Sequence, residues 1–99
     1  MRLSKQEINC IIESVSHVLG IKAKVWLFGS RCDDKAKGGD IDLYIELPPM
    51  ENVFMKKIKL RLLLEDGLGE QKIDLVCRQT NQPLSPFHEQ AKTRGILLK

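Results

Sequence analysis

The sequence predicts a small α/β (α+β) domain, in which helices cover one face of a mixed β-sheet. Segments with apolar residues at helical spacing alternate along the chain with short segments that are apolar throughout or at every second position. The predicted order is helix, strand, strand, helix, strand, helix. A chain of 99 residues has the length of one domain, so we expect residues 1–99 to fold as a single unit.

A helix and a strand are predicted at the start of the chain. The helix is expected over residues 5–19, where isoleucine, valine and leucine recur at helical spacing behind a capping box of Ser4 and Glu7. Cys10 is expected on the polar side of this helix. Residues 24–28 include four consecutive large apolar side chains, which is typical of a strand buried on both faces.

The remaining elements are predicted in the second half of the chain. Residues 40–47 alternate strictly between polar and apolar, and residues 72–77 have a similar pattern, so both are expected to be strands. Residues 51–65 have a helical composition and end at glycines, and residues 86–94 follow a serine that suits a helix start. The apolar face of the sheet needs the helices, so we expect its polar face to stay open.

Composition argues against several classes of function. The net charge of +3 is too small an excess to indicate a nucleic-acid-binding surface. The three cysteines and two histidines have no spacing that is typical of a zinc site or a disulfide framework. The sequence contains neither a signal-peptide-like stretch nor about 18 consecutive apolar residues. We therefore expect a cytoplasmic protein with reduced thiols and no contact with membranes or nucleic acid.

Aspartates occur inside the predicted strands, where this residue is disfavoured. Asp40 and Asp42 are two positions apart, so their side chains leave the same face of the sheet, and Asp74 lies in the next predicted strand. If the two strands are neighbours, the three carboxylates converge and repel one another unless a cation lies among them. Oxygen ligands without histidine or cysteine favour Mg²⁺ or Mn²⁺, and two such ions can support a phosphoryl displacement.

Gly29 and Ser30 follow the first predicted strand and offer a site for phosphate. Glycine allows a polyphosphate to approach the backbone, and the amides and the Ser30 hydroxyl can donate hydrogen bonds to its oxygens. Arg31, with Lys35 or Lys37, could neutralise further phosphate charge. The sequence therefore predicts a loop that holds a triphosphate beside a strand that holds metal ions.

These motifs together resemble the signature of the DNA polymerase β-like nucleotidyltransferase superfamily, which has Gly-Ser followed after a loop by Asp-x-Asp. Here the motifs are Gly29-Ser30 and Asp40-Ile41-Asp42-Leu43, with nine residues between them. Asp74 resembles the third carboxylate of the superfamily. The small size and the segments Leu27–Arg31 and Arg94–Leu98 resemble one branch, the minimal nucleotidyltransferases (MNT).

The resemblance implies a palm-like nucleotidyltransferase fold and an antitoxin paired with a helical HEPN-domain ribonuclease toxin. The implied reaction is Mg²⁺-dependent transfer of AMP from ATP to a hydroxyl acceptor, which the resemblance implies to be a tyrosine of the HEPN partner. The implied catalytic and metal-binding residues are Asp40, Asp42 and Asp74. The implied nucleotide-binding residues are Gly29, Ser30 and Arg31.

Several alternatives stay open at this point. The chain could neutralise its partner by occlusion, without catalysis, or it could transfer a nucleotide to a small molecule. The apolar surface of residues 53–64 is a candidate docking surface, in a homo- or hetero-oligomer. Tyr44 shares the polar face of its strand with the aspartates, so it could stack near a nucleotide base or pack beneath the loop.

Overall fold

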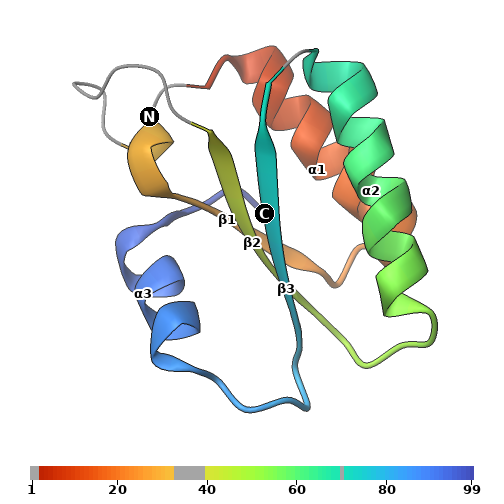
Figure 1. Ribbon diagram of the computed structural model, residues 1–99, viewed down its shortest axis with the longest axis vertical. Coiled ribbons are helices and arrows are strands. Elements are labelled where there is room, and N and C mark those ends of the chain that lie inside the picture. The colour runs from red at the N-terminus through yellow and green to blue at the C-terminus, as the bar shows by residue number, and fades with distance from the viewer. Residues whose placement is uncertain (1–2, 33–39, 70) are drawn as a thin grey trace.

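The computed structural model describes residues 3–32, 40–69 and 71–99, and the side chain of Ser30 lies outside this description. The elements confirm the predicted fold class. In chain order they are α1 (Lys5–Leu19), β1 (Lys24–Phe28), a 3₁₀ turn η1 (Gly29–Cys32), β2 (Ile41–Leu47), α2 (Val53–Leu68), β3 (Ile73–Gln79), α3 (Pro86–Arg94) and β4 (Ile96–Leu97). Figure 1 shows how they are arranged.

The four strands form one mixed sheet in the order β3-β2-β1-β4. β1 is antiparallel to both β2 and β4, whereas β2 and β3 are parallel and are joined by the crossover helix α2. The parallel pairing aligns Ile41 with Ile73 and continues to Leu47 and Gln79. This register brings the first residues of β2 and β3 to the same end of the sheet.

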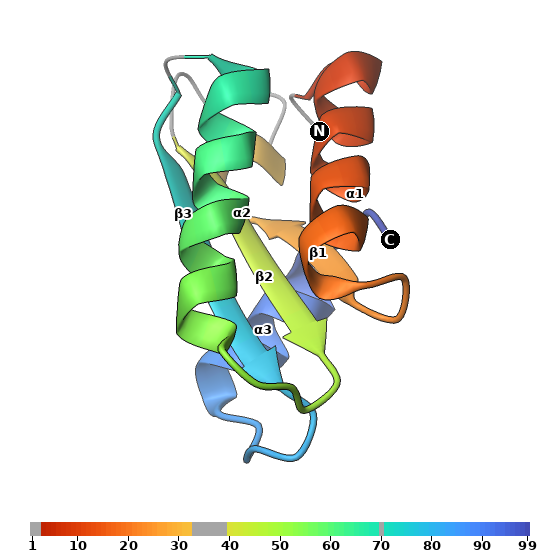
Figure 2. The same cartoon turned by 90° about the vertical axis from the view of Figure 1, so that its right-hand side faces the viewer.

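α1 and α2 cover one face of the sheet, as predicted, and the main core lies beneath them (Figure 2). The two helices pack against each other at Gly67, where an added Cβ would overlap the Cys10 sulfur. The prediction that Cys10 faces solvent is therefore wrong: its side chain is partly buried against α2. α2 continues three residues beyond the predicted end at residue 65: it passes through Gly67 and ends at Leu68, where Gly69, one of the glycines expected to end it, forms the C-cap with a φ of 78°.

The opposite face of the sheet is open over only part of its area, which corrects a second expectation. α3 lies against this face (Figures 1 and 2), and Ala91 packs there on Trp26 and Tyr44. The physical reason is the size of the two aromatic side chains. Tyr44 is fully buried and Trp26 nearly so, and α3 removes this apolar area from water.

The element boundaries differ from the predicted ones by a few residues. Asp40 precedes β2 rather than belonging to it, and β3 continues two residues beyond the predicted end. The short strand β4 was not predicted. Within the part of the chain that the structure describes, none of the helices has the length and apolar character that a membrane span requires.

Candidate active site

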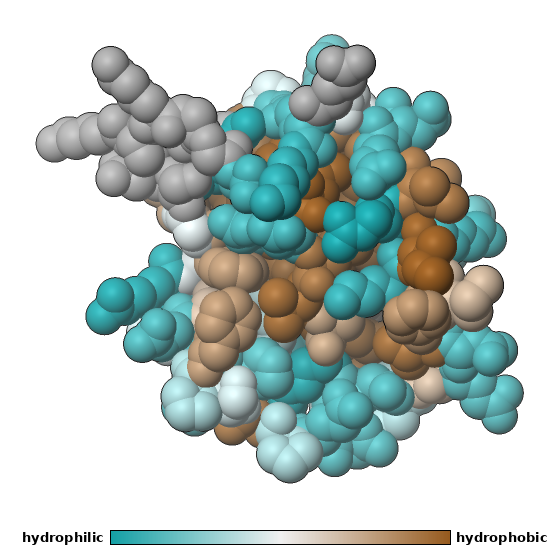
Figure 3. Space-filling model, viewed as in Figure 1, coloured by the Kyte–Doolittle hydropathy of each residue, from teal (hydrophilic) through white to brown (hydrophobic). Residues whose placement is uncertain are grey.

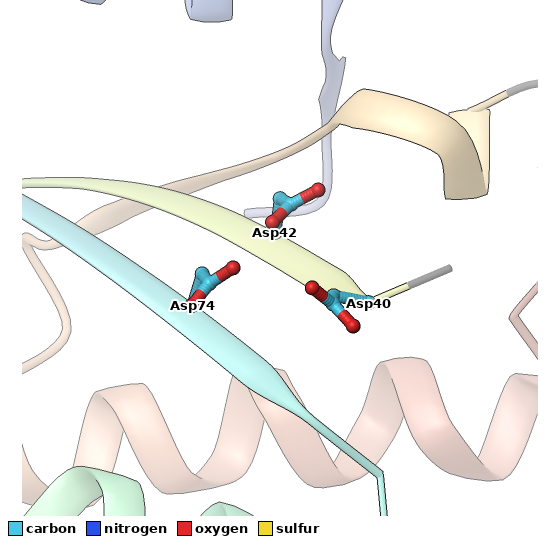
Figure 4. Close-up of side chains that lie close together, drawn as sticks. All are labelled: Asp40, Asp42 and Asp74. Atoms are coloured by element: carbon cyan, nitrogen blue, oxygen red, sulfur yellow. The ribbon is translucent and has the colours of Figure 1, made fainter.

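The parallel register of β2 and β3 places Asp42 directly beside Asp74. Both side chains lie on the face of the sheet opposite α1 and α2, and Asp40 adds a third carboxylate just before β2 begins. One carboxylate oxygen of each residue lies within 4.8 Å of the others. Figure 4 shows the three groups turned toward one another. The convergence expected from the sequence is therefore present.

Burial, together with the crowding of carboxylates, makes Asp42 difficult to ionise. Burial raises the pKa of Asp42 from 3.8 to about 6, with further contributions from the hydrogen bond to Asp74 and the negative charges of Asp74 and Asp40. Lys72 opposes the shift and forms an ion pair with Asp40 at 3.6 Å, but its side chain is mostly exposed. An exposed pair of this kind compensates little of the repulsion.

Gly29 brings η1 against this cluster. Phe28 is the cross-strand partner of Asp42, so the chain leaves β1 beside the carboxylates. Gly29 has a φ of 81°, and a Cβ at this position would overlap the Asp42 carboxylate oxygen. Only glycine therefore satisfies both the backbone conformation and the space beside Asp42. The sequence predicts a phosphate-binding role for Gly29, which remains a prediction, and it did not reveal this contact with Asp42.

Arg31 is held by polar groups of the α1 and α2 layer. Its Nη2 donates to Oε1 of Gln71 at 2.6 Å, and Gln71 donates from Nε2 to Glu7 at 2.8 Å. The hydrogen bond from Gln71 is also the largest cause of a lowered pKa at Glu7. These contacts tie η1 to the first helix, and the phosphate-binding role of Arg31 remains a prediction.

The other predicted phosphate ligands are placed only in part. Ser30 lies in η1, directly after Gly29, and its side chain lies outside the described part of the structure. Lys35 and Lys37 also fall outside the described residues.

Tyr44 is fully buried, so the prediction that its ring could stack on a nucleotide base is wrong; the loop considered as its other neighbour lies largely outside the described residues. Its ring stacks on His88 of α3, with 5.3 Å between ring centroids, and its hydroxyl donates to Glu46 at 2.7 Å. Glu46 is nearly buried and pairs with Arg78 at 3.0 Å and Lys92 at 3.2 Å. Sequence reasoning missed this network. The available signal was the period of two that places Tyr44 and Glu46 on one face.

The sequence of the chain matches one protein family. The family is described as Polymerase beta, Nucleotidyltransferase, and the match covers residues 7–99. The chain belongs to this family. None of the curated proteins compared with the chain matches it. Nucleotidyl transfer in general is thus the class of activity that family membership indicates for this nucleotidyltransferase domain.

The donor set of the site fits divalent cations of the kind such enzymes use. It consists of carboxylate oxygens, which are hard ligands that suit Mg²⁺ or Mn²⁺. Burial is the largest cause of the raised pKa of Asp42, and the negative charges of Asp74 and Asp40 add to it; this repulsion is what a bound cation would relieve. Asp40, Asp42 and Asp74 are the residues that would hold it.

Proposed function

We propose that this nucleotidyltransferase moves AMP from ATP to a hydroxyl group, with Mg²⁺ or Mn²⁺ held by Asp40, Asp42 and Asp74. One observation carries the proposal: the carboxylates of Asp42 in β2, Asp74 in β3 and Asp40 just before β2 converge within 4.8 Å, and Asp42 lies directly beside Gly29. The glycine turn brings the backbone of η1 against the carboxylate cluster, so a polyphosphate on η1 would lie beside the groups that hold its counter-ions. Family membership supports the reaction class.

In the proposed reaction, the triphosphate lies along η1 and its α-phosphorus is close to the carboxylates. When bound, the divalent cations neutralise the charge of the phosphates and of the attacking oxygen. Asp74 accepts the proton of the acceptor hydroxyl, whose oxygen forms the new bond to the α-phosphorus. The bond to the bridging oxygen breaks, and pyrophosphate leaves with the electron pair. Catalysis would depend on positioning and on charge neutralisation.

We propose a tyrosine of a HEPN-domain protein as the acceptor, which would make the chain an antitoxin. The choice of partner rests on the resemblance to minimal nucleotidyltransferases. An exposed apolar stripe on α2 supports the existence of a protein partner. The α2 stripe consists of Phe54, Met55, Ile58 and Leu62, which are 41% to 73% exposed. Figure 3 shows the apolar side chains that gather over α2.

The surroundings of the stripe favour a partner with acidic groups. Lys57 and Arg61 lie one turn apart on one side of it, and Lys59 lies on the other. An apolar surface flanked by cations fits a partner surface with an apolar centre and carboxylates around it. Leu60 and Leu64 are buried against the sheet, so this part of the predicted surface belongs to the core.

The test is to incubate the protein and the product of the neighbouring gene with α-labelled ATP and Mg²⁺. We expect label on the neighbour, a loss of at least a hundredfold in the Asp42→Asn variant, and unchanged transfer in Glu13→Gln, an exposed charge change on α1. Replacing Phe54 and Met55 by serine should abolish the complex. A stable complex without label would refute catalysis and support occlusion, whereas undiminished transfer by Asp42→Asn would refute the role of the carboxylates.

A further inference from the structure

A cavity of about 150 Å³ opens beside the carboxylates, between the end of β1 and α3. Its lining consists of Phe28, Gly29, Phe87, Gln90, Ala91 and Arg94. Its volume is well below the roughly 300–1,000 Å³ of pockets that enclose a whole drug-sized ligand. The cavity therefore suits one flat group of a larger ligand whose remainder lies outside it.

The cavity adjoins the carboxylate site, and Gly29 belongs to both. Gly29 lines the cavity, and the same residue faces the Asp42 carboxylate without a Cβ between them. Phe28 is the cross-strand partner of Asp42, so the two side chains leave the same face of the sheet as neighbours. A molecule whose phosphate lies at Asp42 has its adjacent group within reach of Phe28.

The walls of the cavity are chemically suited to a planar aromatic group. Phe28 and Phe87 meet edge to face, with 5.5 Å between centroids and 87° between ring planes, so they offer two surfaces at a right angle. Phe87 is half exposed, although it lies on the face of α3 that turns toward the sheet. This exposure leaves one ring surface open to a ligand.

Polar groups at the rim indicate which aromatic group would fit. Gln90 and Arg94 lie one turn apart on α3, on the same side as Phe87, and both are exposed. A glutamine amide can donate and accept at once, which is the pairing that adenine takes from N6–H and a ring nitrogen. The Arg94 guanidinium adds a cation that stacks on bases.

We propose that this cavity binds the adenine base of the nucleoside triphosphate, in the corner that Phe28 and Phe87 form, where the Gln90 amide hydrogen-bonds with the edge of the base. The inference rests on the proposed function, because it assigns the base of the same nucleotide. α3 thereby becomes part of the substrate site. The end of α3 is fixed for this role by Gly95, since a Cβ there would lie 2.8 Å from the Leu27 carbonyl oxygen of β1.

The test compares the binding of MgATP, MgCTP and magnesium tripolyphosphate, which has the phosphates and no base. We expect the wild type to bind MgATP at least tenfold more tightly than tripolyphosphate. Phe87→Ala should weaken MgATP binding by roughly five- to a hundredfold, the range for losing one base–aromatic stack, and leave tripolyphosphate within twofold. Gln90→Ala should reduce the preference for ATP over CTP.

Two further variants separate binding from folding. Phe87→Leu keeps apolar volume and removes the flat ring, so it should lose MgATP affinity while its urea unfolding stays close to that of the wild type. Ile21→Ala removes an exposed apolar side chain outside the cavity, so it should change neither the affinity for MgATP nor the stability in urea.

Equal affinity for MgATP and tripolyphosphate, or a parallel loss of both in Phe87→Ala, would overturn the base site and leave the nucleotidyltransferase proposal intact. If the wild type binds neither ligand, the proposed function fails and the base site fails with it.

Discussion

Replacing Asp42 by asparagine is expected to stabilise the metal-free protein while it abolishes nucleotidyl transfer. The folded protein raises the pKa of Asp42 from 3.8 to about 6, with burial as the largest cause and the hydrogen bond and charge of Asp74 next. Ionised Asp42 is thus less favourable in the folded chain than in the unfolded one. Asparagine has nearly the same shape without the charge, and its amide can donate to the Asp74 carboxylate.

The size of the effect follows from the pKa shift. The difference between a pKa of 3.8 and one of about 6 corresponds to a destabilisation of the folded protein by at most about 3 kcal/mol. Asp42 is only partly buried, so solvent screening reduces this limit, and we expect the free energy of unfolding to rise by about 1 kcal/mol. In a domain of this size, that gain corresponds to a rise of about 4–8 °C in Tm.

The gain should depend on pH in a defined direction. A raised pKa means that the folded state binds the proton more tightly than the unfolded state does. Asp42 therefore does not lower the free energy of unfolding below pH 3.8, and it lowers this free energy by the full amount above about pH 6. The advantage of Asp42→Asn should therefore be absent at pH 3.5, grow between these values and remain constant above them. Added Mg²⁺ should stabilise the wild type more than the variant, because the cation binds the cluster in the folded state.

Urea unfolding in EDTA at pH 3.5, 5 and 7.5 measures this difference, with Glu13→Gln as a control for the loss of one exposed negative charge. Equal stability of wild type and Asp42→Asn at pH 7.5 would refute the argument that burial and the neighbouring carboxylates disfavour ionised Asp42. A gain that persists undiminished at pH 3.5 would assign the effect to packing instead of charge.

Two glycines give further predictions that can be tested by the same unfolding measurement. Gly29→Ala should lower the free energy of unfolding by about 1 kcal/mol more than Gly20→Ala does, and it should abolish transfer. Both glycines have a positive φ, but of the two only Gly29 has a neighbour, Asp42, where the new Cβ would lie. An equal cost at both positions would contradict this. Gly67→Ala should be destabilising despite the higher helix propensity of alanine, since its Cβ overlaps the Cys10 sulfur. Adding Cys10→Ala to this variant should restore its stability. If the double variant is as unstable as Gly67→Ala, the contact between the Cβ and the Cys10 sulfur is not the cause of the loss.

The sequence contained most of the information that places the carboxylates. The period of two in residues 40–47 puts Asp40 and Asp42 on one face, whatever the neighbouring strands are. The helix between the second and third strands favours a parallel pair, because such a crossover returns the chain in the same direction. The register that aligns Asp42 with Asp74 was beyond sequence reasoning, since it is set by how the apolar faces of both strands fit beneath α1 and α2.

The position of α3 could not be predicted in the same way. Residues 86–94 are mostly polar and contain only Phe87 and Ala91 as candidates for packing, so no apolar stripe indicates which face of the sheet they cover. The decisive side chains lie elsewhere in the sequence, in Trp26 and Tyr44, which are too large to remain exposed on the sheet. Burial of Cys10 escaped prediction for a similar reason, because it depends on Gly67 of another helix.

On the face of the sheet opposite α1 and α2, β2 contributes both to the carboxylate site and to the contact with α3. Asp42 lies in the open part, and Tyr44 and Glu46, the next residues on that face, lie beneath α3. Burial would raise the pKa of Glu46, but the Tyr44 hydroxyl and Lys92 hold it below its usual value, so Glu46 stays ionised in the network.

Lys92 binds Glu46 from α3, and His88 of the same helix stacks on Tyr44. These contacts, together with the close approach at Gly95, fix α3 at both ends. These contacts oppose a shift of α3 toward the carboxylates, and they place Phe87 against Phe28. The network that sequence reasoning missed thus connects the fold to the site: it determines where the open part of the sheet ends and where the cavity beside it begins.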